Sequence, residues 1–117
     1  MSTANFIVIQ DSTSHISDNP IFAHPSLVEF PAFGAIDADL ALRPVLTLEV
    51  SASGDVTLLI TLNRVEVINE TITQGFKRMM SEVVNENILQ ANSNELIVAA
   101  IGPGHLTISD IILWYRK

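Results

Sequence analysis

The sequence contains no cysteine and few basic residues, and both absences exclude classes of protein. Without cysteine no disulfide can stabilise the chain, so its 117 residues must supply one hydrophobic core of ordinary size. Only 6 residues are Lys or Arg against 13 Asp or Glu, which gives a formal net charge of −7. Nucleic acids and anionic membrane surfaces attract basic patches. We therefore exclude both as partners.

Long hydrophobic runs are missing as well. No stretch reaches the ~18 apolar residues of a membrane-spanning segment, and the N-terminus lacks the basic region of a signal peptide. We accordingly expect a cytoplasmic protein with one domain over residues 1–117. The composition is nevertheless apolar, with 48% hydrophobic and 16% charged residues. Because exposed apolar patches often mark interfaces, this composition predicts a homo-oligomer.

The first third of the sequence is rich in residues that favour turns. After an expected short strand over residues 6–9, Ser, Asp and Asn side chains compete for the backbone hydrogen bonds. Three prolines and Gly34 then interrupt any regular segment. We predict an irregular N-terminal third as far as Asp39, which serves either as a functional surface or as a lid over one end of the fold.

From Arg43 onward, apolar and polar residues alternate, a pattern that predicts β-strands. Two alternating runs, residues 46–51 and 56–62, flank Ser53-Gly54-Asp55 and predict an antiparallel hairpin. Further strands are predicted at 65–67, 96–101 and 105–115, with Gly102-Pro103-Gly104 as a second hairpin turn.

The last predicted strand has apolar residues in both phases of the alternation. Asp110 shares the phase of Leu106 and Trp114 unless a β-bulge intervenes. Because large aromatic side chains are mostly buried, we expect Trp114 in the core.

The sequence pattern of residues 76–84 is compatible with either a helix or a strand. Their apolar residues have the spacing of one helix face, whereas the strand-like neighbours and short loops favour a strand.

Two segments between Asp55 and Val98 share a pattern of hydrophobic and turn residues. They read Leu58-Leu59-Ile60-Thr61-Leu62-Asn63-Arg64-Val65-Glu66-Val67 and Leu89-Gln90-Ala91-Asn92-Ser93-Asn94-Glu95-Leu96-Ile97-Val98. These segments resemble the galactose-binding-like jelly rolls, including the sugar-binding domains of β-galactosidase-type hydrolases. That family has an Asn-Gly turn in the first segment, where this chain has Arg64, and a Leu-x-x-Gly-x-Asn-x-Leu-x-Val block in the second. Asn92 takes the Gly position of the block, where Asn also tolerates a left-handed backbone.

The resemblance implies an all-β fold, an antiparallel, jelly-roll-like β-sandwich. It also favours the strand over the helix for residues 76–84.

Candidate ligand-binding residues gather in the first third. Sugar sites combine an aromatic face with polar side chains, and His24, Phe33, Asp37 and Asp39 offer both. Asp37 and Asp39 also have the spacing of hard-cation loops, and the resembled family often carries a structural calcium near its N-terminal loops. These two are therefore candidate calcium ligands. The alternative is a solvated turn, with the phenylalanines closing one end of the sandwich.

Catalytic motifs are missing from the sequence. The histidines at 15, 24 and 105 have no zinc spacing, and there is no G-x-S-x-G motif. We infer a non-enzymatic binding or assembly module that self-associates, with carbohydrate as one possible ligand. The alternative is a small hydrolase or isomerase whose site is assembled from His and Asp residues of the N-terminal loops, and a metal bound by His15, His24 and one of the two aspartates also stays open.

Overall fold

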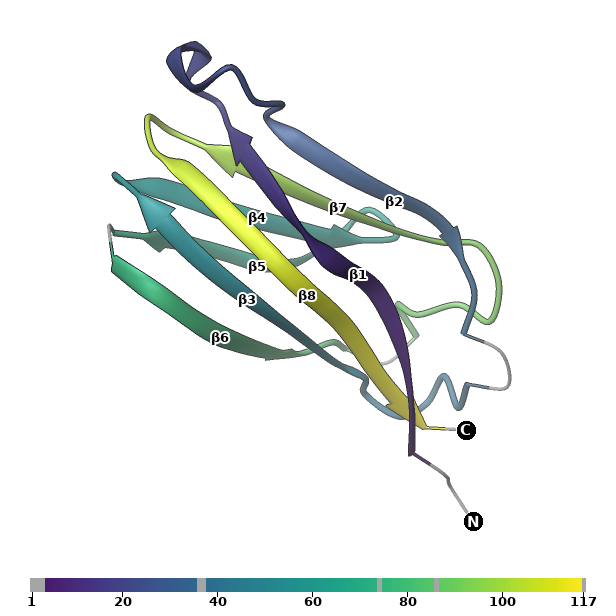
Figure 1. Ribbon diagram of the computed structural model, residues 1–117. Coiled ribbons are helices and arrows are strands. Elements are labelled where there is room, and N and C mark those ends of the chain that lie inside the picture. The colour runs from purple at the N-terminus through teal and green to yellow at the C-terminus, as the bar shows by residue number, and fades with distance from the viewer. Residues whose placement is uncertain (1–3, 36–37, 74, 86, 117) are drawn as a thin grey trace.

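The structure is a computed structural model that describes residues 4–35, 38–73, 75–85 and 87–116. Its elements are β1 (Ala4–Ser17), the 3₁₀ turn η1 (Pro20–Phe22), β2 (Leu27–Phe33), β3 (Val45–Ser53), β4 (Val56–Leu62), β5 (Val65–Ile72), β6 (Gly75–Val83), β7 (Asn94–Ile101) and β8 (His105–Arg116) (Figure 1). No helix among these residues is long and apolar enough to cross a membrane.

The strands form two antiparallel sheets of four. The first sheet has the order β1-β8-β3-β6 and the second has the order β2-β7-β4-β5 (Figure 1). The predicted all-β antiparallel sandwich is confirmed, and residues 75–83 form a strand, as the resemblance favoured.

The core lies between the two sheets. In β3, β4 and β7 every second side chain is buried, because successive residues of a strand point to opposite faces. Burying each such Leu or Ile contributes roughly 1.5–3 kcal/mol to stability. The fully buried side chains include Ile16, Leu46, Leu48, Val50, Leu58, Ile60, Leu62, Leu96, Leu106, Ile108, Ile111 and Leu113.

The predicted hairpin over residues 46–62 is wrong. Both strands exist, but β3 belongs to the first sheet and β4 to the second, so the chain between them arches across the core. Residues 102–104 form a second such arch, from β7 to β8, and are not a hairpin turn either. Alternation of apolar and polar residues shows only that one face of a strand is buried. Two strands in opposite sheets that face each other across the core show the same pattern as two hydrogen-bonded neighbours in one sheet. The strands of a real hairpin, β4 and β5, meet at Asn63-Arg64, where both residues have positive φ (51° and 68°) as a type I′ turn requires.

The two arches pack directly against each other. The Gly104 N–H donates to the Asp55 carbonyl oxygen over 2.9 Å. A Cβ atom at Gly104 would lie only 2.8 Å from that oxygen, so no larger residue fits without a backbone shift. Gly54, with φ of 82°, supplies the left-handed conformation of the first arch.

The predicted irregular N-terminal third is also wrong, because most of it is strand. β1 pairs with β8 along its whole length, but its register shifts between Val8 and Gln10 and again between Gln10 and Thr13. β2 pairs with β7 and contains Pro31, which an edge strand tolerates because one side of it has no partner strand. The bulges of β1 and the edge proline of β2 interrupt the alternation of apolar and polar residues that predicts a strand.

A β-bulge at Asp110 explains the two apolar phases of β8. Asp110 has φ of 54°, and the pairing with β3 shifts by one residue at this point. Buried residues accordingly change from Leu106 and Ile108 before the bulge to Ile111 and Leu113 after it. The bulge turns Trp114 outward, so the expected core position of this side chain is wrong.

We predict that Gly104→Ala destabilises the protein by about 2 kcal/mol, because the added methyl group overpacks the contact between the arches. Gly34→Ala is the matched control, since a Cβ at Gly34 would meet its nearest neighbour at an ordinary 3.6 Å. Urea unfolding of both variants measures the difference. Equal stabilities would show that the arches are not closely packed.

Candidate functional site

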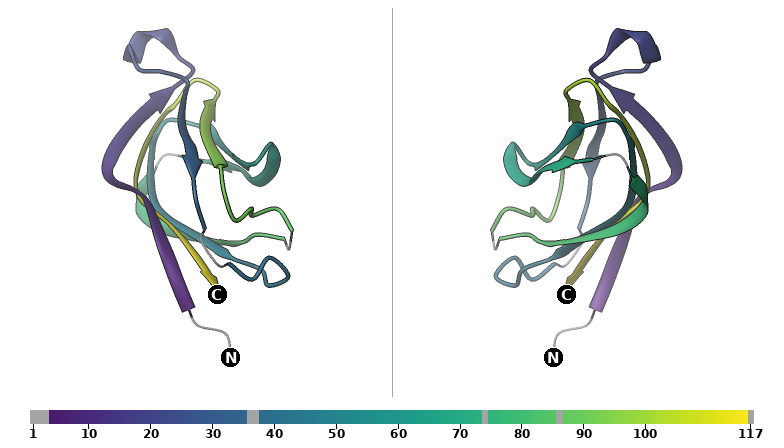
Figure 2. Two further views of the ribbon diagram at one scale, coloured as in Figure 1. Left: turned by 90° about the vertical axis from the view of Figure 1, so that its right-hand side faces the viewer. Right: turned by 90° about the vertical axis from the view of Figure 1, so that its left-hand side faces the viewer.

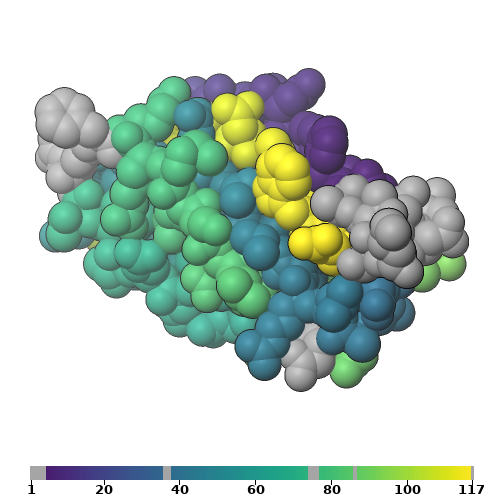
Figure 3. Space-filling view, turned by 90° about the horizontal axis from the view of Figure 1, so that it is seen from below, coloured from purple at the N-terminus to yellow at the C-terminus, as the bar shows by residue number. Residues whose placement is uncertain are grey.

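The outer face of the first sheet carries exposed apolar side chains near the end of β8 (Figure 3). Phe6 on β1 pairs with Trp114 on β8, and Trp114 pairs with Val45 on β3. In the next row, Val8 pairs with Ile112. We call these five residues the aromatic face.

Phe6 and Trp114 form the centre of the aromatic face. Their ring centroids are 5.3 Å apart with an interplanar angle of 42°. The Trp114 Nε1–H donates to the Thr47 hydroxyl over 2.9 Å, which fixes the orientation of the indole. Phe6 remains 53% exposed and Trp114 43% exposed. Because burying aromatic area is strongly favourable, a preordered aromatic pair left this open makes the surface a candidate binding site.

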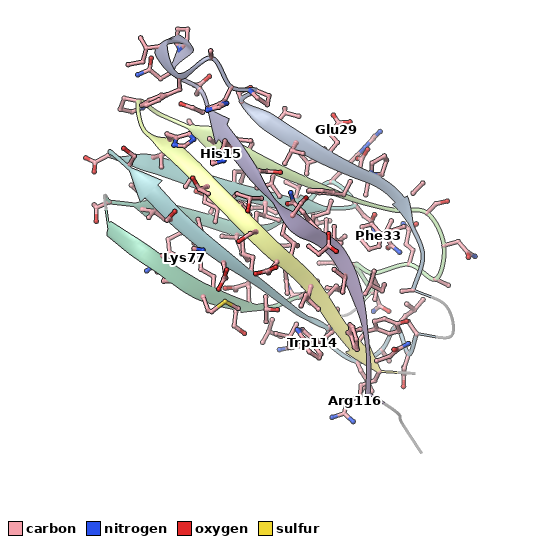
Figure 4. All side chains as sticks on the ribbon, in the orientation of Figure 1. His15, Glu29, Phe33, Lys77, Trp114 and Arg116 are labelled. Carbon is pink, nitrogen blue, oxygen red and sulfur yellow. The ribbon has the colours of Figure 1, made fainter. Side chains whose placement is uncertain are left out.

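A hollow of about 300 Å³ adjoins Trp114. Its lining residues are Asn5, Arg43, Val45, Trp114, Tyr115 and Arg116. Asn5 Nδ2 donates to the Tyr115 hydroxyl over 2.9 Å, which ties β1 to the end of β8. Figure 4 shows Trp114 and Arg116 at this end of the strand. The lining thus combines the aromatic residue Trp114 with Arg116, which lies on the same face of β8.

Polar residues continue the same face along β3 and β6. The Ser109 hydroxyl donates to Glu49 Oε2 over 3.3 Å, and Lys77 Nζ lies 3.8 Å from the same oxygen (Figure 4). These contacts are partly or well exposed, so each contributes little to stability. They add charged hydrogen-bonding groups next to the aromatic face.

A second hollow of about 370 Å³ lies beside the turn between β4 and β5. Four of its lining residues, Ala32, Asn63, Arg64 and Ser93, have positive φ, between 51° and 68°. The prediction of a left-handed backbone at Asn92 is therefore wrong by one residue, because Ser93 takes that conformation.

Asn94 fixes the loop beside this second hollow. Its fully buried side chain accepts from the Gln90 N–H over 2.7 Å and from Asn63 Nδ2 over 2.9 Å. Its own Nδ2 donates to the carbonyl oxygens of Phe33 and Gln90. The Asn63 Oδ1 in turn accepts from the Glu95 N–H over 2.8 Å. The asparagines of the two resembling segments are thus structural and bond to each other.

The predicted ligand-binding residues do not come together. His24 stacks on His105, where β8 begins, whereas the Asp39 N–H donates to the carbonyl oxygen of Arg116, where β8 ends. A strand of 12 residues separates the two ends by roughly 35 Å, so a small ligand cannot contact both. Phe33 lies at the end of β2, partly buried against the core. Asp37 lies outside the described residues.

The histidines of the predicted His–Asp site likewise lie at the opposite end of β8 from Asp39. Asp39 Oδ1 accepts from the Ala41 N–H over 3.1 Å within its own turn. His15, His24 and His105 do meet, but their rings stack and present faces to one another. Among the described residues, no three His, Asp or Glu side chains are arranged to hold a metal ion. Calcium binding by Asp37 and Asp39 remains a prediction.

No known protein family and no curated protein matches the sequence. Solved structures match the fold. Dimeric latent PorU from Porphyromonas gingivalis aligns with a TM-score of 0.69 and 10% identity over 99% of this chain, which spans 13% of the PorU chain. A mutant of a carbohydrate binding module of family 29 aligns with a TM-score of 0.50 and 12% identity, covering 97% of this chain and 92% of the module. At such identities the likeness shows a common β-sandwich fold.

We predict that Asn94→Ala destabilises the protein by about 3 kcal/mol, because it leaves buried backbone groups at Phe33 and Gln90 without partners. Asn63→Ala should be less harmful alone. In the double variant the two losses should fall short of additivity by about 1 kcal/mol, since the two side chains share a hydrogen bond. Urea unfolding of all four proteins measures this coupling, and full additivity would contradict it.

Proposed function

We propose that the chain is a non-catalytic carbohydrate-binding module and that the aromatic face with its adjoining hollow is the binding site. The half-exposed Phe6–Trp114 pair carries this proposal. A sugar ring presents C–H groups on one side, which pack on an aromatic face, and hydroxyl groups around its rim. Arg116, which lies on the same face of β8 as Trp114 and also lines the hollow, supplies hydrogen-bond donors for such hydroxyl groups.

The chemistry of the hollow supports binding without catalysis. Glycoside hydrolysis requires two carboxyl groups at a fixed separation. Among the described residues, those that line the hollow contain no carboxylate. The fold shared with the family 29 carbohydrate binding module and the resemblance to galactose-binding-like jelly rolls favour the same class of function. Both are analogies of fold, so the aromatic face carries the argument.

Self-association through the same face is a second candidate function. Beyond the aromatic pair, Val8, Met79 and Val83 are each about half exposed or more on the outer side of the first sheet. An apolar sheet face of this kind packs well on a second sheet. Light scattering during size-exclusion chromatography tests this candidate, because a protein that stays monomeric at high concentration would exclude self-association.

Tryptophan fluorescence provides the test of sugar binding, because Trp114 is the sole tryptophan of the chain. A panel of neutral and acidic oligosaccharides is titrated into the protein, with calorimetry for any that alter the emission. We expect Trp114→Ala and Phe6→Ala to weaken binding at least about tenfold, the equivalent of losing roughly 1.4 kcal/mol of stacking.

Leu27→Ala is the matched control. Leu27 is 42% exposed, as Trp114 is, but lies on β2 of the second sheet, so its loss should leave the affinity unchanged. Two results would overturn the proposal: no oligosaccharide of the panel binds the wild-type protein, or the Trp114→Ala variant binds as tightly as the wild type.

A further inference from the structure

All three histidines of the chain meet at the end of the sandwich opposite the aromatic face. His15 comes from β1 (Figure 4). His24 comes from the segment 18–26, and His105 from the start of β8. Their ring centroids lie 5.1 to 5.5 Å apart, with interplanar angles between 10° and 24°. Phe22 stacks on His105 at 5.3 Å. Four rings from three separate segments therefore form one stack.

The stack attaches a segment that is otherwise weakly held. Residues 18–26 project beyond the ends of the strands (Figure 2), and η1 within them contains no buried residue. Backbone bonds tie the base of the segment, from the Ser17 N–H to the Pro25 carbonyl and from the Ala100 N–H to the Ser26 carbonyl, each 2.9 Å. Asn19 Nδ2 donates to the Pro103 carbonyl over 3.0 Å. The Phe22 and His24 rings supply the side-chain packing.

Charge on the imidazoles opposes this packing. Neutral imidazole rings stack without an electrostatic penalty, whereas imidazolium ions about 5 Å apart repel each other. His105 Nε2 is buried and has no hydrogen-bond partner among the described residues, so a proton there would lack compensation. Burial lowers the pKa of the His105 imidazole below its usual value, and the charges of His24 and His15 lower it further.

No carboxylate offsets this repulsion at His105. The carboxylates on the elements around the cluster are Asp11 on β1, Asp18 in the segment, Glu29 on β2, Glu49 on β3, Asp55 in the first arch, Glu95 on β7 and Asp110 on β8. Tyr115 and Arg116 lie at the far end of β8. None of these carboxylates contributes to the lowered pKa of His105, which is set by burial and by the two other imidazoles.

We propose that His15, His24 and His105 form a pH-sensitive latch, which holds segment 18–26 against the sandwich when the imidazoles are neutral and releases it when they are protonated. Because the closed latch keeps His105 neutral, the open state takes up more protons once the pH falls below the usual imidazole pKa of 6.5. The stabilisation from the latch is therefore complete above that pH and is lost as the pH falls through the lowered pKa of His105.

Hydrogen exchange followed by NMR tests the latch through two reporter amides. The Ser17 and Ala100 N–H groups bond to the carbonyl oxygens of Pro25 and Ser26 at the C-terminal end of the segment, whereas the Val84 N–H bonds to the Pro44 carbonyl away from the latch. Between pH 7.5 and 5.5 we expect the protection factors of Ser17 and Ala100 to fall about tenfold, because the latch opens as the imidazoles take up protons, while that of Val84 stays constant. Unchanged protection at both reporters would overturn the proposal.

Variants separate the histidines from other titrating groups. His24→Phe keeps a stacking ring without a titratable nitrogen, so the fall in protection at the reporters should become smaller than in the wild type, because one of the two imidazoles that oppose protonation of His105 is gone. Asp18→Asn removes a charge from the same segment and should leave the response as in the wild type. A wild-type response in His24→Phe, or its loss in Asp18→Asn, would contradict the latch. The wild-type titration decides the matter alone if His24→Phe does not fold.

Discussion

Burial between the two sheets is the interaction on which the other features depend. β3, β4, β7 and β8 each place aliphatic side chains into one shared core, and no sheet could bury them alone. Most strands that follow one another in sequence therefore lie in different sheets, whereas β4 and β5 form a hairpin within one sheet. The crossings at residues 54–55 and 102–104 meet where a glycine leaves just enough room. The position of the strands at this end is thus set by backbone contact as well as by side-chain burial.

The same core determines which side chains lie on the outer face of the first sheet. Because strand residues alternate between faces, one extra residue at Asp110 exchanges the inner and outer sides of β8. After the bulge, Leu113 enters the core and Trp114 leaves it. The register of β1 against β8 shifts over the same stretch, between Val8 and Thr13. Phe6 therefore lies on the same outer face of the sheet as Trp114, with which it pairs. The aromatic face is a consequence of these irregularities.

Sequence patterns predicted the strands that bury one full face and failed where other constraints act. The alternation over residues 45–62 located β3 and β4, but a period of two carries no information about which sheet a strand joins. Only residues 6–9 of β1 were predicted as strand and β2 was missed, because bulges and Pro31 break the period. The predicted ligand residues were chosen because they are close in sequence. The groups that actually meet, Phe6 with Trp114 and His15 with His105, come from opposite ends of the chain through the pairing of β1 with β8.

The β1–β8 ladder thus builds both ends of the molecule, the aromatic face at one and the histidine stack at the other. Its register is not continuous, because two shifts between Val8 and Thr13 divide it into separate halves. A small rearrangement in one half can be absorbed at the bulges before it reaches the other. Release of the segment 18–26 is therefore compatible with an unchanged Phe6–Trp114 pair, and a ligand on the aromatic face need not disturb the histidines. Coupling between the two ends would have to pass through the core, which is continuous from Ile16 to Leu113.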